Sequence, residues 1–308
     1  MMGIAMSRNL VPSSEPPKGG VLTVDRLSAL LERFRARTAL FHTGPLCGTS
    51  TFEPRPGRGF LHVLRRGAMT VRHPASSGAP RTMRIDEPTL LLYPRPLRHV
   101  FVNPPREGSD FTCASVDFDG GEHNPLVLAL PPLVRIRLRD VEGLQPALEL
   151  LFAETDQLRC GSRLLADRLF EVVLIQLLRW IIDHPHRIGV SRGLIAALSD
   201  PRLARAVVAV HQSPGDDWTL PRMAQVAAMS RSAFAESFKK ATGTTPAAYL
   251  TTWRLTLATS MLRASRPVNV IATDLGFAST SSLSKAFRQQ FGVSPRAWLA
   301  SADTIPKS

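Results

Sequence analysis

The spacing of apolar residues divides the chain into a strand-rich first part and a helical remainder. Between Val21 and about Arg139, short apolar runs alternate with Gly and Pro, which is typical of short strands joined by turns. One short amphipathic helix, residues 25–35, precedes them. Many short strands of this kind predict a β-sandwich or barrel. The expected strand segments are TALFHTG, GFLHVLRRGAMTVRH, TLLLYPRPLRHVFV and FTCASVDFDG.

The period changes near Val141, where Leu, Ile and Val begin to recur at helical spacing. Residues 141–158 and 162–184 are two expected helices, and the second is apolar over more than one face. Such a helix is buried, either in its own domain or against a second copy of the chain. The segment HPHRIGVSRG, residues 184–193, is the best candidate for a linker. From Leu194 onward the pattern is helical, with Pro and Gly between short segments.

Two stretches of the helical part repeat one pattern. They are MAQVAAMSRSAFAESFKKATGTTP, residues 223–246, and IATDLGFASTSSLSKAFRQQFGVSP, residues 271–295. Each contains a small residue, a turn, an apolar pair at i and i+4, and Gly followed by Pro and an aromatic residue. A chance match to one helix-turn-helix is common in helical bundles, but two matched copies favour a genuine pair of such units.

The residues at the key positions fit a helix-turn-helix in physical terms. Ala224 and Ala272 are small where two helices must cross closely, and Gly276 suits a left-handed turn. Ser230 and Ser279 stand where the second helix of each unit requires an N-cap. The outward faces of the second helices are polar with basic flanks, which a DNA major groove accepts. These faces comprise Arg231, Ser232, Ala235, Glu236, Lys239 and Lys240 in the first copy, and Thr280, Ser281, Ser284, Lys285, Arg288 and Gln289 in the second.

The segment between the copies, PAAYLTTWRLTLATSMLRAS, predicts one continuous helix. Pro246 suits its first position, and Leu250, Trp253, Leu257 and Met261 fall on one stripe. A rigid helix here would hold the two recognition helices about one duplex turn apart, roughly 34 Å. One chain could then read two neighbouring half-sites.

The charge balance agrees with a polyanionic partner. The net charge of +13 and pI of about 11.0 favour nucleic acid first and an anionic membrane surface second, although an arginine-rich composition alone explains part of it. No apolar run reaches membrane-spanning length, the first residues show no signal-peptide pattern, and three scattered cysteines do not make a disulfide framework. We therefore expect a cytoplasmic protein without a membrane partner.

The stretch from about Ser199 to Ala300 resembles the DNA-binding domain of AraC/XylS-type transcriptional regulators, through MSRSAFAESFKKATGTTPAAYLTTWRLTLATSML and IATDLGFAS…LSKAFRQQFGVSP. The resemblance implies base contacts from the first two turns of each recognition helix. Two departures are Ala228, where the family usually has Gly, and Ser282–Leu283, which replaces a small residue followed by an aromatic. The implied base-contacting positions are Arg231, Ser232, Ala235 and Glu236, then Thr280, Ser281, Ser284 and Lys285, with Lys239, Lys240 and Arg288 as basic flanks.

The first part resembles the cupin-type sensor half of one AraC subgroup, through DEPTLLLYPRPLRHVF, residues 86–101, together with PLCGTSTF, GFLHVLRRG and NPLVLALPPL. Metal-dependent cupin enzymes carry two clustered histidines with a glutamate, whereas His62 stands alone here. A cupin metal enzyme is therefore disfavoured, and we expect no catalytic residue, metal or cofactor.

Four residues of the strand-rich part form a possible sensor: Cys47, His62, His99 and Cys113. A purely structural role is one reading, because buried cysteines behave as small hydrophobic residues. The two thiols could instead oxidise to a disulfide, or thiols and imidazoles could bind zinc or copper. A small organic ligand in the barrel mouth is a further alternative.

The predicted fold is α+β and multidomain, with an N-terminal cupin-like β-barrel, central helices and a C-terminal all-α domain of two helix-turn-helix units. The predicted function is a DNA-binding transcriptional regulator controlled by a small-molecule or redox signal, with promoter DNA, RNA polymerase and a second copy of the chain as expected partners. The alternatives are a cupin-type metal enzyme and a DNA-repair alkyl transferase with a DNA-binding domain. The expected boundaries are 1–20 disordered tail, 21–139 cupin-like domain, 140–184 central or dimerisation helices, 185–198 linker and 199–301 DNA-binding domain.

Overall fold

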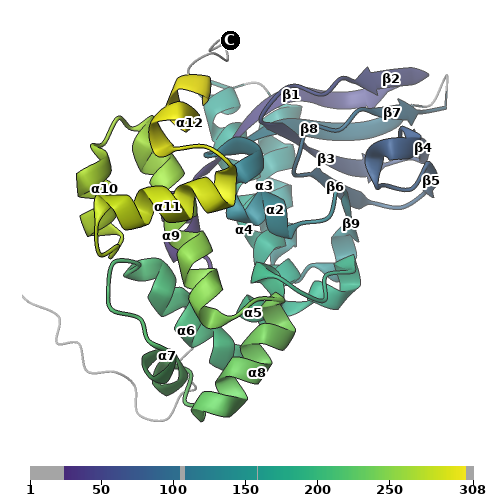
Figure 1. Cartoon of the computed structure of the whole chain (residues 1–308). Helices are drawn as coiled ribbons and strands as arrows, with labels where there is room; N and C mark the ends of the chain where they lie inside the picture. The colour runs from purple at the N-terminus through teal and green to yellow at the C-terminus, as the bar shows by residue number, and fades with distance from the viewer. Residues whose placement is uncertain (1–23, 105–107, 158, 303–308) are drawn as a thin grey trace, which may run out of the picture.

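The computed structural model describes residues 24–104, 108–157 and 159–302. The expected disordered tail, residues 1–20, lies outside the described residues. Figure 1 shows a strand-rich part on one side of the molecule and a helical part on the other. This division confirms the α+β multidomain prediction.

Two antiparallel sheets make up the strand-rich part. The five-stranded sheet has the order β1-β8-β3-β6-β9, and the four-stranded sheet has the order β2-β7-β4-β5. A core of buried side chains from both sheets lies between them. β2, β5 and β9 fall outside the expected strand segments, while the other strands largely follow them. The strands are β1 (Ala36–Leu46), β2 (Thr49–Phe52), β3 (Arg58–Arg66), β4 (Met69–Arg72), β5 (Thr82–Ile85), β6 (Thr89–Tyr93), β7 (His99–Val102), β8 (Ser109–Phe118) and β9 (Val134–Arg137).

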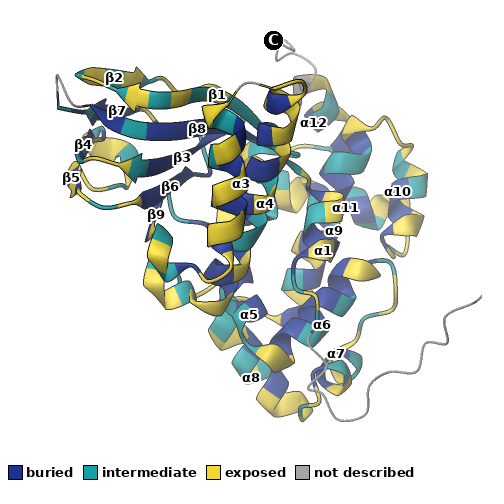
Figure 2. Ribbon diagram, turned by 180° about the vertical axis from the view of Figure 1, so that it is seen from behind, coloured by how far each residue is buried: buried dark blue, intermediate teal, exposed yellow. Residues whose placement is uncertain are grey.

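Strand β3 is covered on both faces, which explains why its sequence is a nearly continuous apolar run. Phe60 and Leu64 join the core between the two sheets, whereas Leu61 and Val63 join the core beneath the helices. Successive side chains of a strand point to opposite faces, so a strand covered on both sides needs apolar residues at every position. Figure 2 shows β3 and β8 as largely buried. The five-stranded sheet is therefore the middle layer of the molecule.

Helices cover the outer face of the five-stranded sheet. The two that pack on it are α3 (Leu144–Asp156) and α4 (Ser162–Asp183), and the short helices α1 (Ser28–Arg33) and α2 (Pro125–Ala129) contribute side chains to the same buried cluster. The two long helices agree with the expected segments, and α4 packs on both α3 and β1. Leu165 and Val172 on α4 nevertheless stay exposed, at 48% and 42%. The apolar second face of α4 is thus only partly used within the chain.

The segment expected as a linker, residues 185–198, is partly helical and packed. A 3-10 turn, η4 (Pro185–Ile188), leads to α5 (Leu194–Ser199), whose apolar side chains are buried. The backbone N–H of Gly193 donates to the carbonyl oxygen of Ala241 at 2.9 Å. Within the expected linker, α5 is thus a packed helix, because its short apolar run finds a partner surface far along the chain.

The remainder is helical, as predicted. One contiguous cluster of buried apolar side chains extends from the outer face of the five-stranded sheet through α4 into these helices. Among the described residues, no helix has both the length and the apolarity to cross a membrane. The helices are α6 (Pro201–Gln212), α7 (Leu220–Val226), α8 (Arg231–Thr242), α9 (Pro246–Arg263), α10 (Val268–Asp274), α11 (Thr280–Phe291) and α12 (Pro295–Ala302).

Candidate DNA-binding site

The first helix-turn-helix unit consists of α7 and α8. The hydroxyl of Ser230 accepts a hydrogen bond from the backbone N–H of Ala233 at 3.3 Å, so Ser230 is the predicted N-cap of α8. Phe234 and Phe238 are buried one turn apart, with ring centroids separated by 5.3 Å. These two rings fix one face of α8 to the core and leave the opposite face to solvent.

The second unit consists of α10 and α11 and begins its second helix with a stronger cap. Ser279 accepts from the N–H of Ser282 at 3.1 Å, and Ser282 accepts from the N–H of Ser279 at 3.0 Å. This reciprocal pair satisfies two N–H groups that a helix start leaves open. Leu283 and Phe287 are buried on the inner face. α11 is therefore anchored in the same way as α8.

The turns of the two units have the left-handed backbone that the sequence predicts. Gly276 has φ of 68°, and Ala228 at the corresponding position has φ of 53°. A side chain in this region costs about 1 kcal/mol because Cβ approaches the following carbonyl oxygen. Both recognition helices then end at a left-handed glycine, Gly243 or Gly292.

The outward faces of α8 and α11 carry the predicted DNA-contacting residues. Figure 2 shows exposed segments along α8. Ala235 and Ser284 are half-buried, and the other predicted positions are exposed. A hollow of about 720 Å³ also follows α11. The exposed positions are Arg231, Ser232, Glu236, Lys239 and Lys240 on α8, and Thr280, Ser281, Lys285, Arg288 and Gln289 on α11.

Five cationic side chains on these two faces are available to an anion. Within the described ranges, Arg231, Lys239, Lys240, Lys285 and Arg288 have no carboxylate within ion-pair distance. Several other arginines in the described ranges are instead held in ion pairs, such as Arg222 with Asp216 at 2.7 Å. Free lysines and arginines on a helix face are the groups that neutralise DNA phosphates.

Helix α9 connects the two units, as the sequence predicts. It has 18 residues, with Pro246 at its start, and at 1.5 Å per residue it spans roughly 27 Å. Tyr249 meets Phe238 of the first unit edge to face, and Arg263 lies 4.9 Å over the ring of Trp298 behind the second unit. Figure 1 shows α8 near one end of α9 and α11 near the other.

Of the four expected sensor residues, the two histidines contact each other. His62 on β3 and His99 on β7 meet between the two sheets, with their Nε2 atoms 2.9 Å apart. His99 Nδ1 donates to the carbonyl oxygen of Leu97 at 2.8 Å, so its Nε2 accepts the proton of His62 Nε2. Tyr93, which sequence reasoning missed, stacks on His99 with ring centroids 4.0 Å apart. Its position in an apolar strand gave no signal of this contact.

These groups are uncharged at neutral pH. Burial holds the pKa of His62 well below its ordinary value and lowers the pKa of His99 to about 3. Burial likewise raises the pKa of the Cys113 thiol well above its usual value. In the parts of the chain that the structure describes, no three His, Cys, Asp or Glu side chains cluster as a metal site. The cluster packs as part of an aromatic core.

Cys47 and Cys113 lie apart in the barrel. Cys113 is buried and pairs with His42 on β1, whereas the ladder between β1 and β8 ends at Leu46 and Ser109 beside the exposed Cys47. About five residues of strand therefore separate the thiols, roughly 16 Å at 3.3 Å per residue. A disulfide requires Cα atoms within about 7 Å. The four expected sensor residues thus do not converge as one group.

Comparison with known protein families agrees with this architecture. A family described as cupin matches residues 25–183, more than half of the chain. The chain belongs to the cupin family. The match includes α3 and α4, so these helices are part of this cupin domain. A family described as helix-turn-helix domain matches residues 223–301, and the cupin-family chain thus ends in an AraC-type pair of helix-turn-helix units.

Several curated proteins are similar to this cupin-family chain. An AraC-like transcription regulator of Streptomyces antibioticus is 36% identical over 195 residues, 61% of this chain and 63% of its own. The regulator AlkR of Acinetobacter baylyi is 33% identical over 195 residues, 61% of this chain and 62% of its own. The chain thus spans less than two thirds of the length of these relatives. The solved structure of ToxT from Vibrio cholerae O395 covers 89% of this chain and 100% of its own at 11% identity, with a TM-score of 0.39.

The residues on either side of α1 connect the cupin domain to the helices that follow it. Arg26 forms an ion pair with Asp183 on α4 at 2.5 Å and donates to the carbonyl oxygen of Leu198 on α5 at 3.2 Å. The ring of Phe34 meets Trp253 of α9 edge to face, with centroids 5.6 Å apart. The residue that follows α1 therefore contacts α9, the helix that carries both units.

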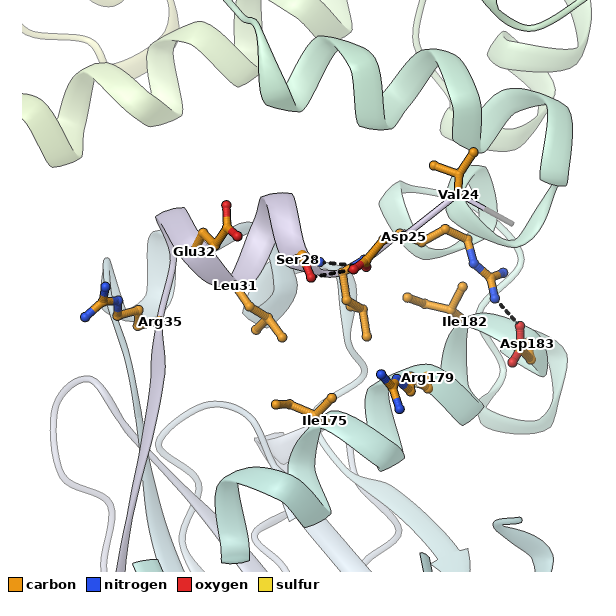
Figure 3. A pocket seen from close by; sticks show the side chains of 12 residues that line it. Val24, Asp25, Ser28, Leu31, Glu32, Arg35, Ile175, Arg179, Ile182 and Asp183 are labelled. Atoms are coloured by element: carbon orange, nitrogen blue, oxygen red, sulfur yellow. Dashed lines mark hydrogen bonds and ion pairs between the residues drawn. The ribbon is translucent and has the colours of Figure 1, made fainter. Parts of the chain in front are cut away.

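A cavity of about 680 Å³ lies between α1 and the C-terminal half of α4 (Figure 3). Leu31 and Ile175 supply apolar lining, Arg35 lies toward one end of the space, and Arg179 lies across from Asp25. Asp25 caps the start of α1 through Ser28, which keeps the pKa of that carboxyl low. The cavity is therefore placed beside the contacts that join the two domains.

Proposed function

We propose that the chain is a transcriptional regulator that binds DNA sequence-specifically and reads two adjacent major-groove half-sites. One observation carries this proposal: two capped recognition helices, α8 and α11, are joined by one rigid helix and present unpaired cations to solvent. The names of the AraC-like relatives support the same function. The polar faces fit a groove, and the basic flanks fit the phosphates beside it.

The residues of each face have separate roles in this proposal. Base contacts come from the first two turns, and backbone contacts come from Lys239, Lys240 and Arg288, which lie farther along the helices. Glu236 is an unusual member, because a carboxylate repels phosphate but accepts from the N4 amino group of cytosine. The base-contacting set is Arg231, Ser232, Ala235 and Glu236 on α8, and Thr280, Ser281, Ser284 and Lys285 on α11.

We further propose that a signal in the cupin domain reaches DNA through α1. The cavity between α1 and α4 supports a small-molecule signal, since an occupant would press on α1 and hence on Phe34 and Trp253. A thiol switch between Cys47 and Cys113 has less support, because the thiols lie apart and Cys113 is buried.

Two protein partners belong to the same proposal. A second copy of the chain would cover the exposed Leu165 and Val172 on α4, which are seven residues apart and share one face. RNA polymerase is the expected partner once the protein is bound at a promoter. Equilibrium sedimentation of Leu165→Glu should show a loss of dimer, whereas an unchanged mass would reject α4 as the contact.

The roles of the two kinds of residue can be separated by binding measurements. Lys239→Ala and Arg288→Ala should weaken binding on all duplexes and each reduce the salt slope by about 1. Lys285→Ala should instead change sequence preference, by about 1–3 kcal/mol at one base pair. Titrations at several salt concentrations on matched and mismatched duplexes would measure both effects. Binding that is unaffected by all three changes would reject this docking arrangement.

The alternative of a DNA-repair alkyl transferase has a direct test. The exposed thiols in the described part of the chain are Cys47 and Cys160. Incubation with methylated duplex DNA should leave the protein mass unchanged. A gain of one methyl group on either cysteine would favour the transferase over the regulator.

A further inference from the structure

Arg254 on α9 contacts the turn of the second helix-turn-helix unit and the loop that leads into the first. Its Nε donates to the carbonyl oxygen of Pro214 at 2.8 Å, and Nη2 donates to that of Asp216 at 2.8 Å. Both carbonyls lie in the loop from α6 to α7, which leads into the first unit. Its Nη1 donates to the carbonyl oxygen of Gly276 at 3.0 Å, in the turn of the second unit. One guanidinium therefore joins two loops.

The two loops also meet backbone to backbone at this point. A Cβ on Gly215 would lie 2.3 Å from the carbonyl oxygen of Asp274. A Cβ on Gly276 would lie 2.4 Å from the carbonyl oxygen of Gly215 and 2.8 Å from Nη2 of Arg254. Glycine at both positions is thus required for the approach, which brings the carbonyl groups within reach of one arginine.

The chemistry of the side chain suits this task better than that of a lysine. A guanidinium holds its N–H groups in a fixed plane, so three carbonyls bound to it are fixed relative to one another. Half-burial lowers the pKa of Arg254, but an arginine stays protonated at neutral pH. A lysine ammonium would keep the charge and lose this planar geometry.

The position of the contact matters because α9 by itself is a single connection. The first unit meets α9 near its start, where Phe238 contacts Tyr249, and the second unit packs along the rest of the helix. A unit held at one place can pivot, whereas a second attachment removes that freedom. Two linked binding modules gain affinity only where their geometry matches the two sites.

We propose that Arg254 is a positioning residue that fixes the two recognition helices relative to each other and thereby sets the half-site spacing that the protein accepts. This inference rests on the proposed function, in which both units engage one duplex. Arg254 itself touches no part of the predicted DNA-contacting faces. Its removal should therefore act on the paired site and spare contact with a single half-site.

The test uses the full chain and the duplex that wild-type protein selects from a random library. Affinity is measured on that paired site, on a duplex with one half-site scrambled, and on paired sites lengthened by 1, 2 and 5 bp. The variants are Arg254→Ala and Arg254→Lys. The matched control is Arg266→Ala, which removes an ion pair to Asp274 at 2.8 Å inside the second unit alone. Circular dichroism melts report whether each variant is folded.

The affinity of both Arg254 variants should fall by about fivefold or more on the paired site and by less than about twofold on the single half-site. A 2-bp insertion between the half-sites should lower the affinity of wild type by about tenfold and that of the Arg254 variants by less than about threefold. Arg266→Ala should show the same ratio of affinities, with and without the insertion, as wild type. Equal losses on paired and single sites, or an unchanged spacing preference in a folded Arg254→Lys, would overturn the inference. If wild-type protein selects no two-element site, the proposed function fails and the inference fails with it.

Discussion

The two helix-turn-helix units have the same arrangement of helices but place different residues at the left-handed position of the turn. The first unit places Ala228 at φ of 53°, and the second places Gly276 at φ of 68° in a turn packed against Gly215 of the loop that leads into the first unit. In the first unit the turn residue has a left-handed backbone, which alanine tolerates at a cost. In the second unit neighbouring backbone excludes any Cβ. A glycine in a repeated motif can therefore be required for packing as much as for conformation.

Of the substitutions that test this comparison, Gly276→Ala should lower the stability of the protein most. It combines left-handed strain with a clash against Gly215 and should lower the free energy of unfolding by on the order of 3 kcal/mol or more. The control is Gly292→Ala, where φ is 77° and no neighbour lies within 4 Å, so strain alone should cost about 1 kcal/mol. Chemical denaturation would measure both. Equal losses would show that packing against Gly215 contributes nothing.

A lower pH should have the next largest effect on stability, and this effect belongs to the first unit. His211 on α6 is buried behind that unit, whereas the second unit contains no histidine. Burial lowers the pKa of His211 to about 3, and its ring stacks on Trp253 with centroids 3.8 Å apart. The unfolded chain takes up a proton near pH 6.5, whereas the folded chain does so only near pH 3. The contribution of neutral His211 to the free energy of unfolding is therefore fully present above pH 6.5 and is lost progressively as the pH falls toward 3.

Between pH 7 and pH 5, His211 should account for about 2 kcal/mol of lost stability. Denaturation of wild type and His211→Gln at both pH values isolates this amount, because His62 and His99 contribute equally to both proteins. The variant should lose about 2 kcal/mol less than wild type over this interval. Identical losses would contradict a neutral His211 in the folded protein.

Ala228→Gly should produce the smallest change and the opposite sign. Glycine adopts φ of 53° without the Cβ penalty, so the variant should be more stable by up to about 1 kcal/mol. The greater flexibility of an unfolded glycine offsets part of this gain. A thermal melt of the full chain would measure it. A clearly destabilised variant would mean that the alanine side chain makes contacts that the strain argument neglects.

The helix-turn-helix units could be predicted from the sequence because their signals are local. Ser230 and Ser279 cap the helices that follow them, and the apolar pairs at i and i+4 determine the buried face within one turn. Most strands of the cupin domain could also be predicted from short apolar runs between turn residues, whereas β2, β5 and β9 fell outside the expected segments. The resemblance to known families then implied which faces contact DNA.

The contacts that depend on distant segments could not be predicted. Arg254 reaches carbonyl groups 40 and 22 residues away, and nothing in its local sequence distinguishes it from an ordinary helical arginine. The pairing of His62 with His99 depends on how two sheets face each other. The same limit applies to the packing of α5 within the expected linker, since its burial depends on contacts with α4, α6 and α8.

The most direct measurement is selection of bound fragments from a random duplex library by the purified full-length protein. The account predicts a motif of two elements whose centres lie about one helical turn, roughly 10 bp, apart. Footprinting on the selected site should show protection of both elements on one face of the duplex. A motif with a single element, or no motif at all, would contradict the claim that both recognition helices read DNA together.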